Sequence, residues 1–380
     1  MSKPEDASVA KVSDESAADK QRLERLLREA RQIHGVSLGQ DAWRRLKRDR
    51  AALLSLWFLV ILGILAFGTP LWPLQSPRQI DTTRAFQRPS VHPWRQPSAT
   101  WVDENGEVDE AAADAAFGDL NFADSQMLTL RARLFGKWEA TSWLGTDDLG
   151  RDQLSRLFWG ARVALLVGLV AALVSLAIGV SYGATAGYFG GWVDSLMMRI
   201  VDVLYSVPFI FIVIFLITIL SEDKIKDWLE ARGIDRIVIF YVVVGAIYWL
   251  TMARVVRGQV LSLRQQQFVE AARTIGCSRA RIIFVHLVPN LLSVIIVYLT
   301  LTIPRVMLFE AFLSFLGLGV EPPDVSWGLL ANEGAKHITP IGIVWWLIVG
   351  PGMALGLTCA ALNRLGDGLR DALDPRLKNR

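Results

Sequence analysis

Cysteine and histidine are scarce in this chain of 380 residues, which contains two cysteines and four histidines. Cys277 lies in a polar segment and Cys359 within an apolar run, so we expect neither a disulfide framework nor a thiolate metal site. The histidines are widely separated, at positions 34, 92, 286 and 337. Because no catalytic or metal-binding side chains converge, the sequence does not indicate an enzyme.

A phosphate-binding loop is also missing. Gly136-Lys137 is a fragment of the Gly-x-x-x-x-Gly-Lys-Ser/Thr pattern, but it lacks the upstream glycine and the following hydroxyl. A strong charge of one sign is missing too, because 40 basic residues nearly balance 37 acidic ones. The chain therefore carries no nucleotide site of this type and no indication of nucleic-acid binding.

Apolar residues are abundant: they make up 52% of the chain, with 14 tryptophans and 17 phenylalanines. That is too apolar for an ordinary soluble protein of this length, so we expect a membrane protein. A spanning helix needs about 17 to 25 residues. The sequence predicts an all-α membrane protein with six transmembrane helices, at 51–69, 163–189, 200–220, 237–256, 287–310 and 341–362.

Basic residues beside these spans predict their orientation, since Lys and Arg are enriched in segments retained in the cytoplasm. Clusters precede the first span, follow the fourth and follow the sixth, at Arg44–Arg50, Arg254–Arg264 and Arg364–Arg380. All three lie on the same side of a six-span chain. We therefore expect cytoplasmic termini, a cytoplasmic segment at 257–286, and outer segments at 70–157, 221–236 and 311–340.

The spans divide the chain into a cytoplasmic N-terminal segment (1–50), the first transmembrane helix (51–69), a long outer loop (70–157), a core of five transmembrane helices (158–364) that includes a polar segment (264–286), and a cytoplasmic tail (365–380). Within the first segment, Asp19–His34 shows leucines at helical spacing among arginines. Such an amphipathic helix either lies on membrane lipid at the inner leaflet or docks onto a cytoplasmic partner.

The outer loop begins with six prolines between residues 70 and 97, which disfavour regular structure and indicate an extended path. Its acidic stretch Asp103–Asp109 fails the ligand spacing of a calcium loop and predicts an Asn-Gly turn instead. Residues 141–162 predict a tight turn capped by Asp147 or Asp148, followed by an amphipathic helix along the outer interface.

The second span places small residues at every fourth position, which are Ala171, Ser175, Gly179, Gly183 and Gly187. Without side-chain bulk, another helix can approach until the two backbones touch. We expect a tight helix–helix contact here, and the alternative is a sliding contact that lines a gate.

Charged residues and prolines interrupt the third and fifth spans. Asp202 lies one turn from Arg199, which favours a structural pair, and Pro208 should kink the same helix. Arg305 is unusual, because a charge at membrane depth costs about 2.5 to 3.5 kcal/mol on insertion scales. It lies near the outer end of its span, where it either snorkels or pairs with another helix, or else it faces a translocation path and attracts an anionic group. Glu310 is the nearest acid but lies on another face.

The most distinctive stretch is polar and separates two spans. Phe268 to Ile275 has helical spacing and ends at Gly276, and Ser278 is placed to cap a second helix that returns to the membrane. This helix–turn–helix suits insertion into a groove on a partner protein. Its contact face comprises Phe268, Ala271, Ala272 and Ile275, with Glu270 and Arg273 at the rim.

The polar segment, with Glu270-Ala271-Ala272, Gly276, His286 and Pro289, resembles the coupling motif of inner-membrane permease subunits of bacterial ATP-binding-cassette (ABC) importers, in the subfamily that carries peptides and sometimes nickel. Five further stretches resemble family motifs in the same order. The last two are most similar to the C-type permease of oligopeptide importers. The stretches are Trp43–Arg50, Gly145–Asp152, Met198–Pro208, Phe309–Gly328 and Gly366–Pro375.

The resemblance implies a non-catalytic subunit of a heteromeric complex in the bacterial inner membrane. It implies two ATPase subunits that bind ATP and Mg, a second similar permease, and an outer binding protein that delivers a peptide. It assigns the ATPase contact to Phe268, Glu270, Ala271, Ala272, Arg273, Gly276 and Ser278, and an outer signature to Asp147, Gly150, Arg151 and Asp152. Our candidates for the translocation path are Asp202, Pro208, Arg305 and Glu310.

Three features depart from the family pattern. The stretch 75–140 is long, Ser221–Arg236 indicates an added charged outer helix, and Arg305 occupies a place where a small or apolar residue is expected.

Two other classes of membrane protein fit the sequence less well. A secondary transporter would show inverted repeats or buried ion-coupling residues, and a membrane enzyme would need converging catalytic groups.

Overall fold

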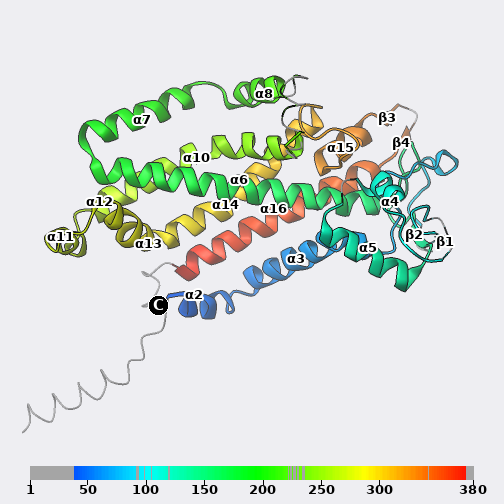
Figure 1. Ribbon diagram of the computed structural model, residues 1–380, viewed down its shortest axis with the longest axis horizontal. Coiled ribbons are helices and arrows are strands. Elements are labelled where there is room, and N and C mark those ends of the chain that lie inside the picture. The colour runs from blue at the N-terminus through cyan, green and yellow to red at the C-terminus, as the bar shows by residue number, and fades with distance from the viewer. Residues whose placement is uncertain are drawn as a thin grey trace, which may run out of the picture.

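The computed structural model describes residues 38–373, except 91–93, 98, 104, 119, 221, 223–224, 226–227, 229–230, 233–235 and 341. The amphipathic helix expected at Asp19–His34, residues 374–380 of the tail, and most of the helix expected at Ser221–Arg236 lie outside the described residues. Long helices run side by side along the longest axis of the molecule, and a smaller folded region lies at one end (Figure 1).

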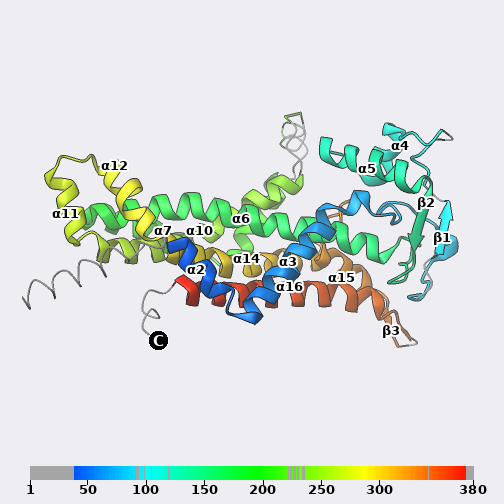
Figure 2. The ribbon, with the colours of Figure 1, turned by 90° about the horizontal axis from the view of Figure 1, so that it is seen from below.

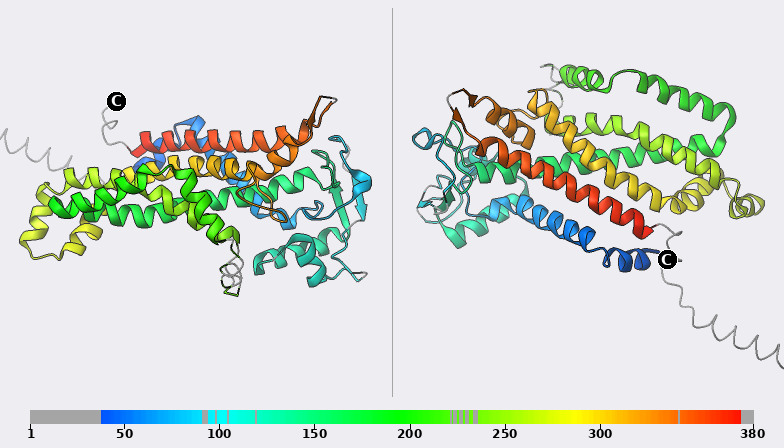
Figure 3. Two further views of the ribbon diagram at one scale, coloured as in Figure 1. Left: turned by 90° about the horizontal axis from the view of Figure 1, so that it is seen from above. Right: turned by 180° about the vertical axis from the view of Figure 1, so that it is seen from behind.

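The long helices form a flat bundle in which α16 packs between α3 and α14, and α6 packs against α10 (Figures 1 and 3). A short helix, α2 (Leu38–Leu46), precedes the bundle and contacts α16. The helix α7 lies at the edge opposite α3 (Figure 1). The bundle consists of α3 (Arg50–Phe67), α6 (Gln153–Phe189), α7 (Gly191–Ser206), α8 (Phe209–Leu220), α10 (Arg236–Leu263), α14 (Leu292–Phe315) and α16 (Trp346–Leu373).

Within the described residues, four helices are long and apolar enough to cross a membrane: α3, α6, α14 and α16. The number rises to five if the bent pair of α7 and α8 is counted as one span. The helix α10 has 28 residues and lies along α6. The structure therefore confirms a mainly helical membrane protein with four to five helices of spanning length and composition.

Several helix boundaries differ from expectation. The helices α10, α14 and α16 continue to Leu263, Phe315 and Leu373, beyond the expected ends at 256, 310 and 362. Two further differences change the architecture. The separate amphipathic helix expected within 141–162 does not form, because Asp152 caps one continuous helix, α6, by accepting a hydrogen bond from the Ser155 N–H at 2.8 Å. The third expected span, 200–220, is not one helix. Its halves α7 and α8 meet at 83° around Val207-Pro208, since proline disfavours a helical conformation in the residue before it. The kink expected at Pro208 is thus a full break.

The contact between α6 and α10 depends on the five small residues predicted to form it, all of which are buried. A Cβ atom on Gly179 would lie 2.6 Å from the Cβ of Met252, and one on Gly183 would overlap the carbonyl oxygen of Ala253. These positions leave no room for a side chain, so the two backbones are in direct contact. The predicted tight helix–helix contact is confirmed.

Both ends of α16 are joined to the first half of the chain. At one end, Trp346 Nε1 donates a hydrogen bond to the carbonyl oxygen of Thr146 at 3.1 Å. At the other, Arg364 Nη2 lies 2.8 Å from Asp49 Oδ2, and Asp49 also caps α3. The first and last long helices are therefore held in a fixed relative position.

The segment between α3 and α6 folds into a small unit. The described part of its proline-containing opening, 70–97, has little regular structure, as expected, with only the short turns η1 (Thr69–Leu71) and η2 (Thr82–Arg84) and one strand. Strand β1 (Trp94–Pro97) pairs antiparallel with β2 (Trp138–Thr141), near helices α4 (Glu110–Phe117) and α5 (Phe122–Phe135) (Figure 2). Trp101 is fully buried among residues of both helices. The guanidinium of Arg131 lies 5.0 Å from the centre of the Trp101 ring and pairs with Glu139 at 3.0 Å, and both charged side chains are buried. Neither these helices nor the strands were predicted from the sequence.

Turns and short strands complete this end of the molecule. The Asn-Gly turn is confirmed: Gly106 adopts φ +84°, and Asp103 Oδ1 accepts from the Asn105 and Glu107 N–H groups at 2.9 and 2.7 Å. A short hairpin of β3 (Ile338–Thr339) and β4 (Gly342–Ile343) follows α15 (Trp327–Ala335).

Gly183→Val should disrupt the contact between α6 and α10, because the added side chain would overlap the Ala253 backbone. Overpacking of this kind costs typically about 1 to 3 kcal/mol, so we expect a lower melting temperature in detergent and less monodisperse protein in size-exclusion chromatography. Gly63→Val is the matched control, since a Cβ atom on Gly63 in α3 meets nothing within 4 Å. Equal losses in both variants would contradict the importance of this contact.

Candidate functional site

A short helix, α11 (Gln267–Thr274), projects from the end of the bundle opposite β1 and β2 (Figures 1 and 2). Gly276 follows it with φ +80°, a left-handed conformation that favours glycine. Ser278 then caps α12 (Arg279–Arg281) by accepting a hydrogen bond from the Arg281 N–H at 3.4 Å. The helix–turn–helix predicted from the sequence is confirmed.

The helix α11 has one buried face and one exposed face. Val269 and Ala272 are buried in a core shared with α6, α10 and the segment after α12. Ala272 therefore does not belong to the partner-facing surface expected from the sequence. Ile275 is 79% exposed and Phe268 38% exposed. Gln267, Arg273 and Thr274 are exposed as well. We call four of the exposed residues the α11 face: Phe268, Glu270, Ala271 and Ile275.

The chain returns from α11 to the bundle through a broken helix. The π-helical turn η3 (Ile282–Leu287) and α13 (Val288–Asn290) lead into α14. Arg273, expected at the rim of the partner contact, lies over the ring of Tyr188 in α6, with its guanidinium 5.3 Å from the ring centre. It therefore helps to fix α11 on its own chain.

Two ion pairs join α7 to α10. Arg257 donates from Nε and Nη2 to the two carboxylate oxygens of Asp194, each at 2.6 Å. Arg254 Nη2 donates to Asp202 Oδ1 at 2.8 Å. The expectation that Asp202 pairs with Arg199 is therefore wrong, because the carboxylate reaches the neighbouring helix rather than along its own.

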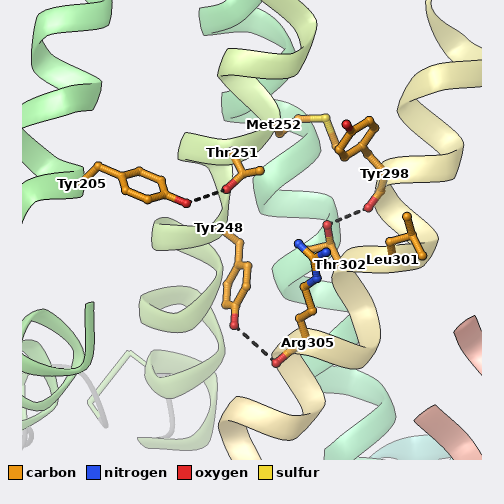
Figure 4. Close-up of a pocket in the computed structure, with 8 residues that line it drawn as sticks. All are labelled: Tyr205, Tyr248, Thr251, Met252, Tyr298, Leu301, Thr302 and Arg305. Carbon is orange, nitrogen blue, oxygen red and sulfur yellow. Dashed lines mark hydrogen bonds between the residues drawn. The ribbon is translucent and has the colours of Figure 1, made fainter. Parts of the chain in front are cut away.

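A cavity of about 150 Å³ lies between α7, α10 and α14 (Figure 4). The hydroxyls of Tyr205 and Thr251 lie 3.4 Å apart and link α7 to α10. The Tyr248 hydroxyl donates to the Arg305 carbonyl oxygen at 3.3 Å and links α10 to α14. Most of the lining is polar, and these residues are Tyr205, Tyr248, Thr251, Tyr298, Thr302 and Arg305.

Arg305 lies near the middle of α14 rather than near its outer end, because the helix continues to Phe315. Its exposed side chain extends along the cavity toward Thr302 (Figure 4). Among the residues that the structure describes, no carboxylate lies within ion-pair distance of the guanidinium. A charge at the bilayer centre costs about 2.5 to 3.5 kcal/mol, and no ion pair within the described chain offsets it. The geometry therefore favours the cavity-facing alternative.

The other candidates for the translocation path lie outside the cavity lining. Asp202 lies on α7, and Pro208 lies in the break after that helix. Arg254, the ion-pair partner of Asp202, also stacks on the Tyr205 ring at 4.2 Å. Glu310 is fully buried, and the Ser314 hydroxyl donates to its Oε1 at 2.8 Å. Of the four candidates, Arg305 is the one that lines the cavity.

Residues of the predicted outer signature form a charge network at the start of α6, in which Asp147 and Arg156 are buried and the other members are partly buried. Arg151 Nε and Arg156 Nη1 donate to Asp147 Oδ2 at 2.6 and 2.7 Å, and Arg156 Nη1 also reaches Glu333 of α15 at 2.6 Å. Burial alone would raise the pKa of Glu333, but hydrogen bonds and charge from the two arginines outweigh it and hold the pKa below its ordinary value. The network fastens α6 to α15.

The turn that precedes α6 needs its glycine. Gly150 adopts φ +73°, and a Cβ atom there would overlap the Asp81 carbonyl oxygen. Asp147 Oδ1 closes this turn by accepting from the Leu149 N–H at 3.0 Å, as predicted. Burial raises the pKa of Asp152 to about 6, although its carboxylate accepts two backbone hydrogen bonds. The signature residues therefore form one structural junction.

Comparison with known proteins places these features in a family. Residues 175–379 match the family described as binding-protein-dependent transport system inner membrane component. The chain belongs to this family. Residues 37–89 match the N-terminal TM domain of oligopeptide transport permease C, so family similarity also covers α2 and α3 of this permease.

Individual relatives of the permease cover most of the chain. It is 37% identical over 353 residues to the dipeptide transport system permease protein DppC of Bacillus subtilis, covering 92% of this chain and 90% of the relative. It is 39% identical over 347 residues to the oligopeptide transport system permease protein OppC of Escherichia coli K12, covering 91% and 93%. A glutathione transport system permease protein, GsiD of Escherichia coli O6:K15:H31, is 42% identical over 237 residues, covering 62% and 73%. The resemblance inferred from the motifs is confirmed.

Sequence reasoning missed several residues of these sites. Arg156 and Glu333 are two of the four members of the charge network, yet they are far apart in the chain. The position of Arg156 just after an acidic turn was a signal that could have identified it. Tyr205, Tyr248 and Tyr298 of the cavity gave no signal, because tyrosines within spans are equally typical of ordinary helix packing.

Asp147→Ala should destabilise the junction between α6 and α15, because it removes the carboxylate that Arg151 and Arg156 share. Removing one partner of a buried ion pair costs about 3 to 5 kcal/mol, and Glu333 should keep the loss near the low end. We expect a lower melting temperature and faster amide hydrogen exchange over residues 145–156. Asp148→Ala is the control, since that side chain is 44% exposed and lies no closer than 3.8 Å to a basic side chain. An equal loss in the control would contradict the assignment.

Proposed function

We propose that this chain is the transmembrane permease subunit of an ATP-driven importer that moves oligopeptides or dipeptides across the bacterial inner membrane. In this proposal the chain has six spans with both termini in the cytoplasm, and it catalyses no reaction itself. The observation that carries the proposal is α11, a short helix with an exposed, partly apolar face at one end of the bundle.

The helix α11 is suited to transmit force because its buried face belongs to the core of the bundle. Val269 and Ala272 pack in one cluster with residues of α6, α10 and η3. Closely packed interiors transmit strain, so a partner that displaces α11 also displaces the ends of α6 and α10. A helix attached through flexible loops alone could not do this.

The α11 face fits a cleft on an ATPase subunit. Phe268 and Ile275 offer an apolar centre and Glu270 a charged border, which is the usual arrangement of a protein–protein contact. The complex would contain two ATPase subunits, which bind ATP and Mg, and a second similar permease. A substrate-binding protein would deliver cargo at the other end. This chain itself would hold no cofactor.

Peptide cargo is supported by the similar permeases, which are named for the transport of dipeptides, oligopeptides and glutathione. The cavity beside Arg305 combines aromatic rings, hydroxyls and one cation. Binding sites for small molecules commonly combine apolar walls with a few placed polar groups, and a peptide offers partners for both.

Glu270→Arg and Gly276→Val should leave the permease inserted but abolish substrate-stimulated ATP hydrolysis by the assembled complex. The first reverses the charge of the α11 face, and the second places a β-branched residue at φ +80°, which strains the turn. A loss of about 1.4 kcal/mol in the contact lowers its affinity tenfold. Gln265→Arg, at an exposed position before α11, is the control. Wild-type stimulation in both variants would exclude this role for α11.

Cysteine labelling tests the proposed orientation. In a Cys277→Ser background, Asn105→Cys should react with a membrane-impermeant maleimide in spheroplasts, and Ile275→Cys should react in inverted vesicles alone. Both positions are exposed, and the remaining Cys359 is buried, so labelling reports the side of the membrane. The opposite pattern would show that α11 faces outward.

A further inference from the structure

Arg305 differs from three other arginines of the long helices, which are paired with carboxylates. Arg254, Arg257 and Arg364 each lie within 2.8 Å of a carboxylate oxygen. Within the described part of the chain, Arg305 has no such partner. It is also far from either end of α14, roughly 20 Å from Leu292 and roughly 15 Å from Phe315 at the helical rise per residue. Its charge therefore remains available at mid-helix, in an open cavity.

The cavity around Arg305 is built from three helices that are linked to one another. The bond between Tyr205 and Thr251 connects α7 with α10, and the bond from Tyr248 fixes the backbone of Arg305 itself. The hydroxyl of Tyr298 has no hydrogen-bond partner among the described residues and lines the same cavity. The site thus combines an unpaired cation and an unpaired hydroxyl on a fixed framework (Figure 4).

A guanidinium in such a site selects for a planar anion. Arginine binds a carboxylate through two parallel N–H···O bonds, a geometry that few other groups match. The same charge repels an ammonium group. The cavity, at about 150 Å³, is smaller than the roughly 300 to 1,000 Å³ of sites that enclose a whole drug-sized ligand. It therefore has room for one end of a longer molecule.

We propose that Arg305 receives the C-terminal carboxylate of the transported peptide, so that the peptide passes this point with its C-terminus against α14. The inference rests on the proposed function and adds an orientation and a specificity to it. Every linear peptide ends in one such carboxylate, whatever its side chains. The tyrosine rings beside Arg305 contact the last side chain of the peptide, since aromatic rings accept apolar groups of many shapes.

The first test compares uptake of a tripeptide with uptake of its C-terminal amide by the complete complex in proteoliposomes. A lost hydrogen bond to a charged group is worth about 1.5 to 3 kcal/mol, which corresponds to a factor of at least about ten. Wild-type complex should therefore prefer the free acid by at least about tenfold, and Arg305→Gln should reduce that ratio to near one. Arg305→Lys, which keeps the charge, should retain part of the preference.

Arg199→Gln is the matched control, since Arg199 is an exposed arginine of α7 outside the cavity. This variant should keep the wild-type ratio. Size-exclusion profiles of all variants establish that each complex is assembled. If Arg305→Gln lowers uptake of acid and amide equally, the arginine pairs within the complex and the inference is overturned.

A second measurement is needed because the binding protein itself could reject the amide, and the uptake ratio would then not report on Arg305. Tripeptides with a photoreactive phenylalanine at the first or at the last position are cross-linked to the complex, and mass spectrometry locates the products. The C-terminal probe should label α10 or α14 near Tyr248 and Tyr298, and labelling by the N-terminal probe instead would overturn the orientation. Absence of ATP-dependent uptake of any peptide by wild-type complex would contradict the proposed function itself, which separates the two failures.

Discussion

Direct contact between the backbones of α6 and α10 is the constraint on which the other features depend. Because Gly179 and Gly183 leave no room for even a methyl group, the two helices have one relative position. The charge network that fastens α6 to α15, the core under α11 and one wall of the cavity are all attached to this pair. The charge network at one end of the bundle and the core under α11 at the other end are therefore held at fixed positions relative to each other.

The features that could be predicted from the sequence depend on neighbours along the chain. The stripe of small residues in α6 repeats every fourth position, so it marks one face of a helix before any partner is known. The turn after α11 is similarly local, since a glycine, a following serine cap and helical spacing on both sides determine it. The structure confirms both interpretations.

The features that could not be predicted depend on residues that are distant in sequence. Asp202 has an arginine one turn away, yet it pairs with Arg254 because α10 lies alongside. Strands β1 and β2 are separated by about forty residues of chain, and α4 and α5 are too short to be stable alone. Arg305 was placed too near the outer end because nothing in its own span shows how far the helix continues.

The two edges of the flat bundle are attached in different ways. At the α3 edge, hydrogen bonds and an ion pair fix α16 at both ends to the first half of the chain. At the α7 edge, the helix is broken before Pro208 and is joined to α10 by side-chain links such as Asp194–Arg257. The bundle thus has one stiff border and one compliant border. If α11 is displaced as proposed, the displacement should bend the compliant border, while the stiff border serves as the frame against which it bends.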